Sequence, residues 1–375
     1  MKKAIGSQKF SEVKTFLEKR NLDCILLFNY GKFLDPNITY FTNLEEIEGM
    51  GRSLFVLSRK TRVLFLGEDV YENLKKEIDC EKVIPLEKLS LKEICRKYLK
   101  KFKRIGINKS KLPLILFERL RKNLKAKFFD VSDFLLNLRA IKTKEEIEIF
   151  KRASKVTNKG IRIIEESIKE IKEEKISEAD LELRLEEEIK RSKCDVSFKI
   201  LVASGKRSKY IHPYPNASFQ KMKKFGYVDF GVKFKGYHTD VTIPFILKEL
   251  NQKEKRIVDL LLDAYELALD SIKIGMKDWK LFEIVNEFIK SKGFELKHGL
   301  GHGLGLEIHE LPAIVPKEKE SKITGLNFEN GMVFTIEPGI YLRNFGLRIE
   351  DDFYFWKNKL KILTQSHLIE DLKRK

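Results

Sequence analysis

The segment YVDFGVKFKGYHTDVTIPF, residues 227–245, decides the fold of the second half of this chain. β-Branched and aromatic residues on both sides of Lys233–Lys235 predict a hairpin that turns there. Asp229 and Asp240 lie at equal distances from this turn, so a regular hairpin pairs them, with side chains about 4.5–5.5 Å apart. Like charges in such a pair destabilise a sheet, and the pair therefore predicts a nearby positive charge.

A second segment, VFTIEPGIYLRNFGLRIEDDF at 333–353, repeats this arrangement. Its turn is expected at Arg343–Gly346, which places Glu337 and Glu350 opposite each other. Each of these acids lies among apolar strand residues, where a carboxylate is costly to bury unless it is paired or bound to a cation. With His302 between the two hairpins, four carboxylates and one imidazole suit one or two divalent cations of the Mn, Co, Fe or Zn kind. The sequence predicts a dinuclear metal site.

His302 lies in HGLGHGLGLEIHE, residues 298–310, a segment in which every second residue from 299 to 305 is glycine. The missing side chains would let the backbone pass close to a metal or a substrate. A phosphate-binding loop is not indicated, because no G-K-[ST] is present. The neighbouring His238 and His298 are interpreted as structural residues or as residues that contact the metal ligands, rather than as catalytic groups.

The chain is expected to form two domains. Up to about residue 130, strand-like and helix-like segments alternate, which predicts an α/β domain. From about Leu138 a long helical segment begins, and the pattern becomes helix, hairpin, helices, hairpin, a rough internal duplication. The predicted fold class is α+β, with domains at 1–132 and 133–375 that pack together without a Pro/Gly/Ser linker.

The composition predicts a globular, soluble, cytoplasmic protein. The chain has 375 residues, 42% of them hydrophobic and 35% charged, and no apolar run long enough to span a bilayer. Its first ten residues, MKKAIGSQKF, lack the apolar core of a signal peptide. The four cysteines are scattered without a C-x-x-C pair, as expected of free thiols in a reducing compartment.

A formal net charge of +18 indicates either an anionic partner or many charged side chains on a solvated surface. Lysines are interleaved with glutamates in IKEIKEEKISEADLELRLEEEIKRSK, residues 168–193, and no nucleic-acid recognition motif is present. The charge is therefore interpreted as a solvated surface spread along the chain. Neither nucleic acid nor a membrane is predicted as the main partner.

Several segments carry a resemblance to one known family. In order along the chain they are LRAIKTKEEIEIFKRAS at 138–154, ASGKRSKYIHPYPN at 203–216, VDFGVKFKGYHTD at 228–240, HGLGHGLGLEIHELP at 298–312, TIEPGIY at 335–341 and GLRIED at 346–351. Together they resemble the successive motifs of the M24 metallopeptidases. The resemblance implies a pita-bread catalytic domain with a pseudo-two-fold repeat, preceded by a smaller creatinase-like α/β domain.

The resemblance also implies a ligand set for two divalent metal ions. Asp229 would bind one ion in a bidentate mode, and Asp240 and Glu350 would bridge both. His302 and Glu337 would each bind the second ion.

Three further roles follow from the resemblance and from general chemistry. Glu337 would take a proton from the attacking water and pass it to the leaving amine. His309 and His212 would contact the substrate and the tetrahedral intermediate. Arg348 and Tyr341 either help to position the substrate or serve packing and a salt bridge, and the sequence does not separate these alternatives.

TIEPGIY, GLRIED and the N-terminal domain are similar to the proline-specific branch of the family. The predicted function is Xaa-Pro dipeptidase, acting on a peptide with proline at the second position as a homodimer. The alternatives are an Xaa-Pro aminopeptidase, or a non-enzymatic protein that binds nucleic acid or a partner through its basic surface. One departure is that Thr242 is followed by Ile243-Pro244, where the family usually has Arg after the Thr.

Overall fold

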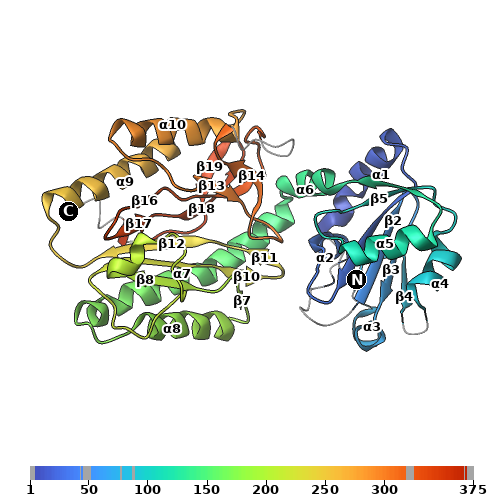
Figure 1. The fold of residues 1–375 in the computed structure, drawn as a ribbon, viewed down its shortest axis with the longest axis horizontal. Coiled ribbons are helices and arrows are strands. Elements are labelled where there is room, and N and C mark those ends of the chain that lie inside the picture. Colours follow the sequence, from blue (N-terminus) through green and yellow to red (C-terminus); the bar gives the residue numbers. More distant parts are fainter. Residues whose placement is uncertain are drawn as a thin grey trace. The chain divides into compact units, whose positions relative to one another are not determined.

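The computed structural model describes residues 5–42, 44, 52–76, 78–86, 89–317, 325–366 and 368–369. The chain divides into two compact units, Met1–Leu138 and Arg139–Lys375, coloured blue to teal and green to red in Figure 1. The domain bounds 1–132 and 133–375 remain a prediction. Among the described helices, none combines the length and the hydropathy needed to cross a membrane.

The N-terminal unit is built on a six-stranded sheet in the order β4-β3-β2-β1-β5-β6. Strand β2 is antiparallel to β1 and β3, and the other neighbours are parallel. The strands are β1 Cys24–Tyr30, β2 Arg52–Ser58, β3 Arg62–Leu66, β4 Lys82–Pro85, β5 Arg104–Ile107 and β6 Lys127–Asp130. The helices are α1 Phe10–Lys19, α2 Pro36–Thr42, α3 Glu68–Leu74, α4 Leu91–Ile94 with the π-helical turn Cys95–Leu99, α5 Leu114–Asn123 and α6 Ser132–Ala140.

Strand β1 is apolar on both faces, as a strand inside a sheet covered by helices on both sides must be. Alternate residues of β1 and β2 pack against α4 and α5 on one face. On the other face, Phe41 of α2 stacks on Phe55 of β2, with ring centroids 6.3 Å apart. The predicted α/β arrangement is therefore observed in this unit, as a sheet with helices on both faces.

The C-terminal unit contains four long helices and thirteen short strands among the described residues. The helices are α7 Lys144–Lys172, α8 Glu178–Arg191, α9 Gln252–Ser271 and α10 Asp278–Ser291. The strands are β7 Asp195–Val196, β8 Leu201–Ser204, β9 Phe225–Phe230, β10 Val232–Phe234, β11 Tyr237–His238, β12 Val241–Ile246, β13 Gly301–Gly303, β14 Glu310–Ile314, β15 Val333–Ile336, β16 Gly339–Tyr341, β17 Gly346–Arg348, β18 Asp351–Trp356 and β19 Lys359–Ile362. Thr143, Ser177 and Asn251 begin α7, α8 and α9 with reciprocal capping boxes.

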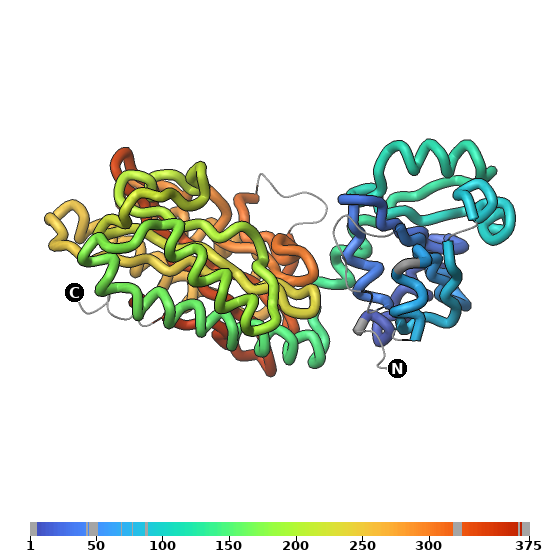
Figure 2. The backbone as a smooth tube through the Cα atoms, turned by 90° about the horizontal axis from the view of Figure 1, so that it is seen from below, coloured from blue at the N-terminus to red at the C-terminus, as the bar shows by residue number. Residues whose placement is uncertain are grey.

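The predicted duplication is visible as two separate hydrophobic cores. Helices α7 and α8 pack on the sheet β12-β9-β8, and α9 and α10 pack on the sheet that contains β13, β15 and β18. Figure 1 shows the two helix pairs on opposite sides of the strands, and Figure 2 shows α7 and α8, in green, from below. The two halves meet where Thr242 and Glu350 exchange backbone hydrogen bonds of 3.3 and 3.1 Å.

The predicted pairing of Asp229 with Asp240 is wrong. Asp229 pairs with Thr242, because the hairpin turns at Lys235 and Gly236 rather than at Lys233–Lys235. Both turn residues have positive φ, 52° and 81°, as tight two-residue hairpin turns require. Asp240 therefore precedes β12 and lies diagonally from Asp229.

The second hairpin has the predicted register. Ile336 pairs with Asp351 and Gly339 with Arg348, so Glu337 and Glu350 lie opposite each other between the two ladders.

Gly160 of α7 is required by the close packing of this helix on β9. A Cβ at this position would lie 2.6 Å from Cε2 of Phe230, a fully buried ring. We expect Gly160→Ala to lower the free energy of unfolding, because overpacking costs about 1–3 kcal/mol and outweighs the gain of about 1 kcal/mol in helix propensity. Urea denaturation measures the change. In the Gly160→Ala/Phe230→Leu double variant the loss should be smaller than the sum of the single losses. A stabilised Gly160→Ala protein would contradict this packing.

Candidate metal centre

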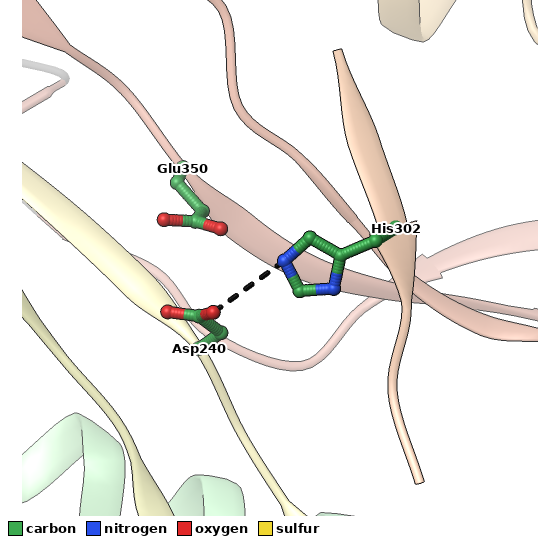
Figure 3. A group of neighbouring side chains, drawn as sticks. All are labelled: Asp240, His302 and Glu350. Atoms are coloured by element: carbon green, nitrogen blue, oxygen red, sulfur yellow. Dashed lines mark ion pairs between the residues drawn. The ribbon is translucent and has the colours of Figure 1, made fainter. Parts of the chain in front are cut away.

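Three side chains from different elements converge on one point. Asp240 precedes β12, His302 lies on β13 and Glu350 lies between β17 and β18, and one ligand atom from each lies within 4.8 Å of the others (Figure 3). Nε2 of His302 is 3.5 Å from Oδ2 of Asp240. Nδ1 of His302 is 3.2 Å from the Gly303 carbonyl oxygen, and a proton donated there leaves the Nε2 lone pair facing the carboxylates.

Glu337 and Asp229 complete the cluster. Oε1 of Glu337 is 3.7 Å from Nε2 of His302, and Asp229 lies close enough for its charge to raise the pKa of Asp240. The structure thus brings all five predicted ligands together, two acids from one half of the duplication and the remaining residues from the other. In the described part of the chain, Oδ1 of Asp229 and Oδ1 of Asp240 are buried without a hydrogen-bond partner.

The electrostatics of the cluster fit divalent cations. Burial raises the pKa of Asp240 well above its ordinary value, and the charges of Asp229 and Glu337 raise it further. Burial and the charges of Asp240 and Glu337 act in the same direction on the pKa of Glu350. Buried carboxylates that repel one another are stabilised by a cation between them, and oxygen-rich sites with one imidazole suit Mn, Fe, Co or Zn.

Arg348 is a buried positive charge that contacts the cluster. Its guanidinium forms a salt bridge with Asp229, and its Nε donates to Oγ1 of Thr242 at 2.8 Å. That hydroxyl donates to Oε2 of Glu350 at 2.7 Å, and Nη1 of Arg348 donates to the Tyr341 hydroxyl at 2.7 Å. Arg348 and Tyr341 are both buried. This geometry favours the salt-bridge alternative over direct contact with the substrate.

The predicted catalytic histidines lie on the exposed side. His309 is exposed, and its ring centroid is 4.3 Å from that of His302. His212 is exposed, in the loop after the 3-10 turn Gly205–Lys209, close enough for its charge to lower the pKa of Asp229.

His298 lies beside Glu337, in keeping with the second of the two roles that the sequence left open for it. Its Nδ1 is 3.6 Å from Oε2 of Glu337 and 2.7 Å from the Gly299 carbonyl oxygen, and burial lowers its pKa to about 4. The sequence held a signal, since residues four apart in an extended segment face the same side, as His298 and His302 do. His238 is buried on β11, where its backbone N–H donates to the Gly305 carbonyl.

Asp352 was also missed. Its fully buried carboxylate accepts the backbone N–H of Asp240 at 3.2 and 3.3 Å. It therefore holds the backbone at Asp240, just before β12 begins. The signal was its spacing, since Asp352 is two residues from Glu350.

Three of the four alternating glycines are required by close packing within the protein. A Cβ on Gly301 would lie 2.1 Å from the Thr335 carbonyl oxygen, and one on Gly303 would lie 2.1 Å from that of Leu311. A Cβ on Gly305 would lie 2.1 Å from Oε2 of Glu310.

A buried ionic network holds the segment that carries His309. Oε1 of Glu310 accepts from Nε of Arg139 at 3.0 Å, and Oε2 accepts from Nζ of Lys142 at 3.3 Å. Arg139 also bonds Oε2 of Glu307 at 2.5 Å. Side-chain exposure is 0% for Glu310 and Lys142, so each charge depends on its partners.

Two protein-family models match this chain. The sequence model of metallopeptidase family M24 matches residues 148–355, and that of the creatinase/prolidase N-terminal domain matches residues 10–141. An Xaa-Pro dipeptidase of Pyrococcus horikoshii is 30% identical over 367 residues, which cover 96% of this chain and 98% of the relative. The corresponding enzyme of Pyrococcus furiosus is 28% identical over 364 residues, 96% of this chain and 98% of the relative.

Solved structures of peptidases superpose on nearly the whole chain. Prolidase from Pyrococcus furiosus superposes with a TM-score of 0.81 at 29% identity, over 94% of this chain and 99% of that one. An X-Pro aminopeptidase from Thermotoga maritima gives a TM-score of 0.79 at 28% identity, over 93% and 97%. The predicted resemblance and fold class are thereby confirmed.

Removing one of the mutually repelling acids should stabilise the protein when no metal is bound. We expect metal-free Asp240→Asn to melt at a higher temperature than metal-free wild type, and Mn²⁺ to raise the melting temperature of wild type far more than that of the variant. Calorimetry with and without Mn²⁺ measures both. Asp263→Asn, an exposed acid on α9, is the matched control and should behave as wild type. A metal-free Asp240→Asn protein less stable than wild type would contradict the repulsion.

The same repulsion gives a pH dependence. Because the pKa values of Asp240 and Glu350 are raised in the folded state, the folded metal-free protein binds more protons than the unfolded chain. Its stability should fall as pH rises above the ordinary carboxyl range, and bound Mn²⁺ should suppress that fall. Urea denaturation at a series of pH values tests this, and a pH-independent difference between the two forms would count against it.

Glu310→Gln should destabilise the protein by about 3–5 kcal/mol, because it leaves Arg139 and Lys142 buried without their shared countercharge. The control is Glu148→Gln, an exposed acid paired with Lys151, which should change little. Urea denaturation compares the two variants, and equal stabilities would show that the buried network is dispensable.

Proposed function

The chain belongs to metallopeptidase family M24, and we propose that it is a dinuclear-metal dipeptidase that hydrolyses the Xaa-Pro bond of short peptides. The observation that carries the proposal is the convergence of Asp229, Asp240, His302, Glu337 and Glu350 in one buried cluster. The relatives named as Xaa-Pro dipeptidases match almost the full length of the chain, both units included. A protein that merely binds a partner would have no need of four costly buried acids.

The proposed metal ligands follow the resemblance. Asp229 would bind one divalent ion, Asp240 and Glu350 would bridge two, and His302 and Glu337 would bind the second. The unpartnered oxygens of Asp229 and Asp240 support this set. Bound ions of this kind lower the pKa of a shared water and stabilise the oxygens of a tetrahedral intermediate. Mn, Co, Fe and Zn all suit the donors, and the metal is a matter for experiment.

Glu337 is the proposed proton carrier. In the metal-free cluster, burial raises its pKa above the ordinary value. It would accept the proton of the attacking water and deliver it to the leaving proline nitrogen. His309 and His212, both exposed beside the cluster, would donate hydrogen bonds to the developing oxyanion and the substrate.

Specificity for proline has a simple chemical basis. The scissile Xaa-Pro amide has no N–H, so a site for it must bind its substrate without a donor at that position. When the bond breaks, the proline nitrogen leaves as an amine and needs a proton. Glu337 is proposed to supply it.

The departure at Ile243-Pro244 leaves the cluster intact. Ile243 is fully buried in the core beneath α7 and α8, and Pro244 pairs with Tyr227 on the edge strand β12. An edge strand tolerates proline because no ladder hydrogen bond is needed on its outer side. The change therefore concerns packing rather than the ligands.

The alternative function is an Xaa-Pro aminopeptidase that acts on longer peptides, which the superposition on an X-Pro aminopeptidase keeps open. A cytoplasmic location, supported by four free cysteines, and a homodimer are further parts of the proposal. Sedimentation tests the dimer.

The assay compares proline release from an Xaa-Pro dipeptide with cleavage of an Xaa-Pro-Yaa tripeptide. Metal-stripped protein should be inactive, and Mn, Co, Fe or Zn should restore activity on the dipeptide. Glu337→Gln should lower kcat at least about 10²-fold, since it removes the proton carrier. Arg52→Gln, an exposed change in the other unit, is the control. Preference for the tripeptide would make the protein an aminopeptidase, and no cleavage by metal-loaded protein would refute the proposal.

A further inference from the structure

The positive charge of this chain is not spread evenly, contrary to the sequence interpretation. Residues 92–127 contain fourteen Lys or Arg and two Glu, a net charge of +12 within a chain whose net charge is +18. These residues form α4, β5, α5 and the start of β6, all in the N-terminal unit (Figure 1). Most of the excess charge of the protein therefore lies on one part of one unit.

Five of these cations surround a shallow hollow of about 720 Å³. Lys103 and Arg104 come from the entry to β5, and Arg121, Lys125 and Lys127 come from the end of α5 and the start of β6. Leu124 and Ala126 complete the lining, so no carboxylate among the described residues faces the hollow.

The cations of the hollow differ in their pairing from cations of the C-terminal unit. In the C-terminal unit, Lys159 pairs with Glu188 at 3.1 Å and Arg184 with Glu170 at 2.7 Å. By contrast, within the described ranges none of the five cations of the hollow forms an ion pair with a carboxylate. The carboxylate of Asp23, next to β5, accepts the backbone N–H groups of Lys103 and Arg104, at 2.6 and 2.9 Å.

Part of the hollow is rigid. The Nε of Arg104 donates to the Asn21 carbonyl at 2.6 Å, and its guanidinium lies 4.3 Å from the Phe129 ring centroid. The Arg104 guanidinium is thus held by two contacts at the border of the hollow. A donor held in place loses less conformational entropy when an anion binds.

We propose that this hollow and the cations around it bind the phosphate backbone of a single-stranded nucleic acid. Unpaired cations repel one another, and an external polyanion relieves that repulsion and releases its own counterions. A chain of phosphates can enter a hollow, whereas a flat lipid surface cannot. A second copy of this chain is a poorer partner, because acids of α7 and α8 such as Glu170 and Glu188 are already paired.

The test measures binding of a fluorescein-labelled 20-nucleotide single-stranded RNA by anisotropy in 50–300 mM KCl. The hollow variant carries Gln at Lys103, Arg121, Lys125 and Lys127. The control variant carries Gln at Lys253, Lys255, Lys290 and Lys292, four exposed lysines of the C-terminal unit, and loses the same charge. We expect the hollow variant to bind at least tenfold more weakly and the control to stay within twofold of wild type. The salt slope should decrease by about 0.7 for each phosphate that the variant no longer neutralises.

Three results would overturn the proposal. Equal weakening in both variants would mean that only net charge matters, and no binding by wild type at 100 mM KCl would remove the site. Tighter binding to phosphatidylglycerol vesicles or polyglutamate than to RNA, abolished in the hollow variant, would assign the surface to a membrane or an acidic protein. Proline release by both variants should equal that of wild type, which separates this proposal from the peptidase function.

Discussion

The backbone bridge between Thr242 and Glu350 is the constraint on which the catalytic unit depends. It joins the sheet beneath α7 and α8 to the sheet beneath α9 and α10, and it fixes Glu350 within reach of Asp240. The Thr242 hydroxyl strengthens the same junction by donating to the Glu350 carboxylate. Because each half contributes acids to the cluster, a small slip at this junction would separate the ligands.

The junction concentrates negative charge where water is largely excluded. Arg348 offsets part of that charge and stays fixed behind the cluster by its bonds to Thr242 and Tyr341. The single guanidinium of Arg348 cannot neutralise four carboxylates, so the cluster attracts further cations. Stability and proposed function therefore conflict here. Repulsion among the acids lowers the stability of the metal-free fold, and the same negative charge would attract the metal ions.

Sequence reasoning located the cluster because apolar strands made its acids conspicuous, and the recurrent motifs identified the family. It failed where backbone conformation decided the outcome. The turn at Lys235 and Gly236 needs positive φ at a lysine, which residue patterns do not reveal, and the pairing of Asp229 shifted with it. The packing role of Gly303 and the role of Asp352 were missed because their partners, Leu311 and the Asp240 amide, are defined only by the folded chain.

The five clustered side chains are proposed to hold two divalent ions at once. The most direct measurement is isothermal titration of metal-stripped protein with Mn²⁺, together with anomalous diffraction from a Mn²⁺-soaked crystal. We expect two ions per chain, both within the cluster formed by Asp229, Asp240, His302, Glu337 and Glu350. Fewer than two ions per chain, or ions bound elsewhere, would contradict it.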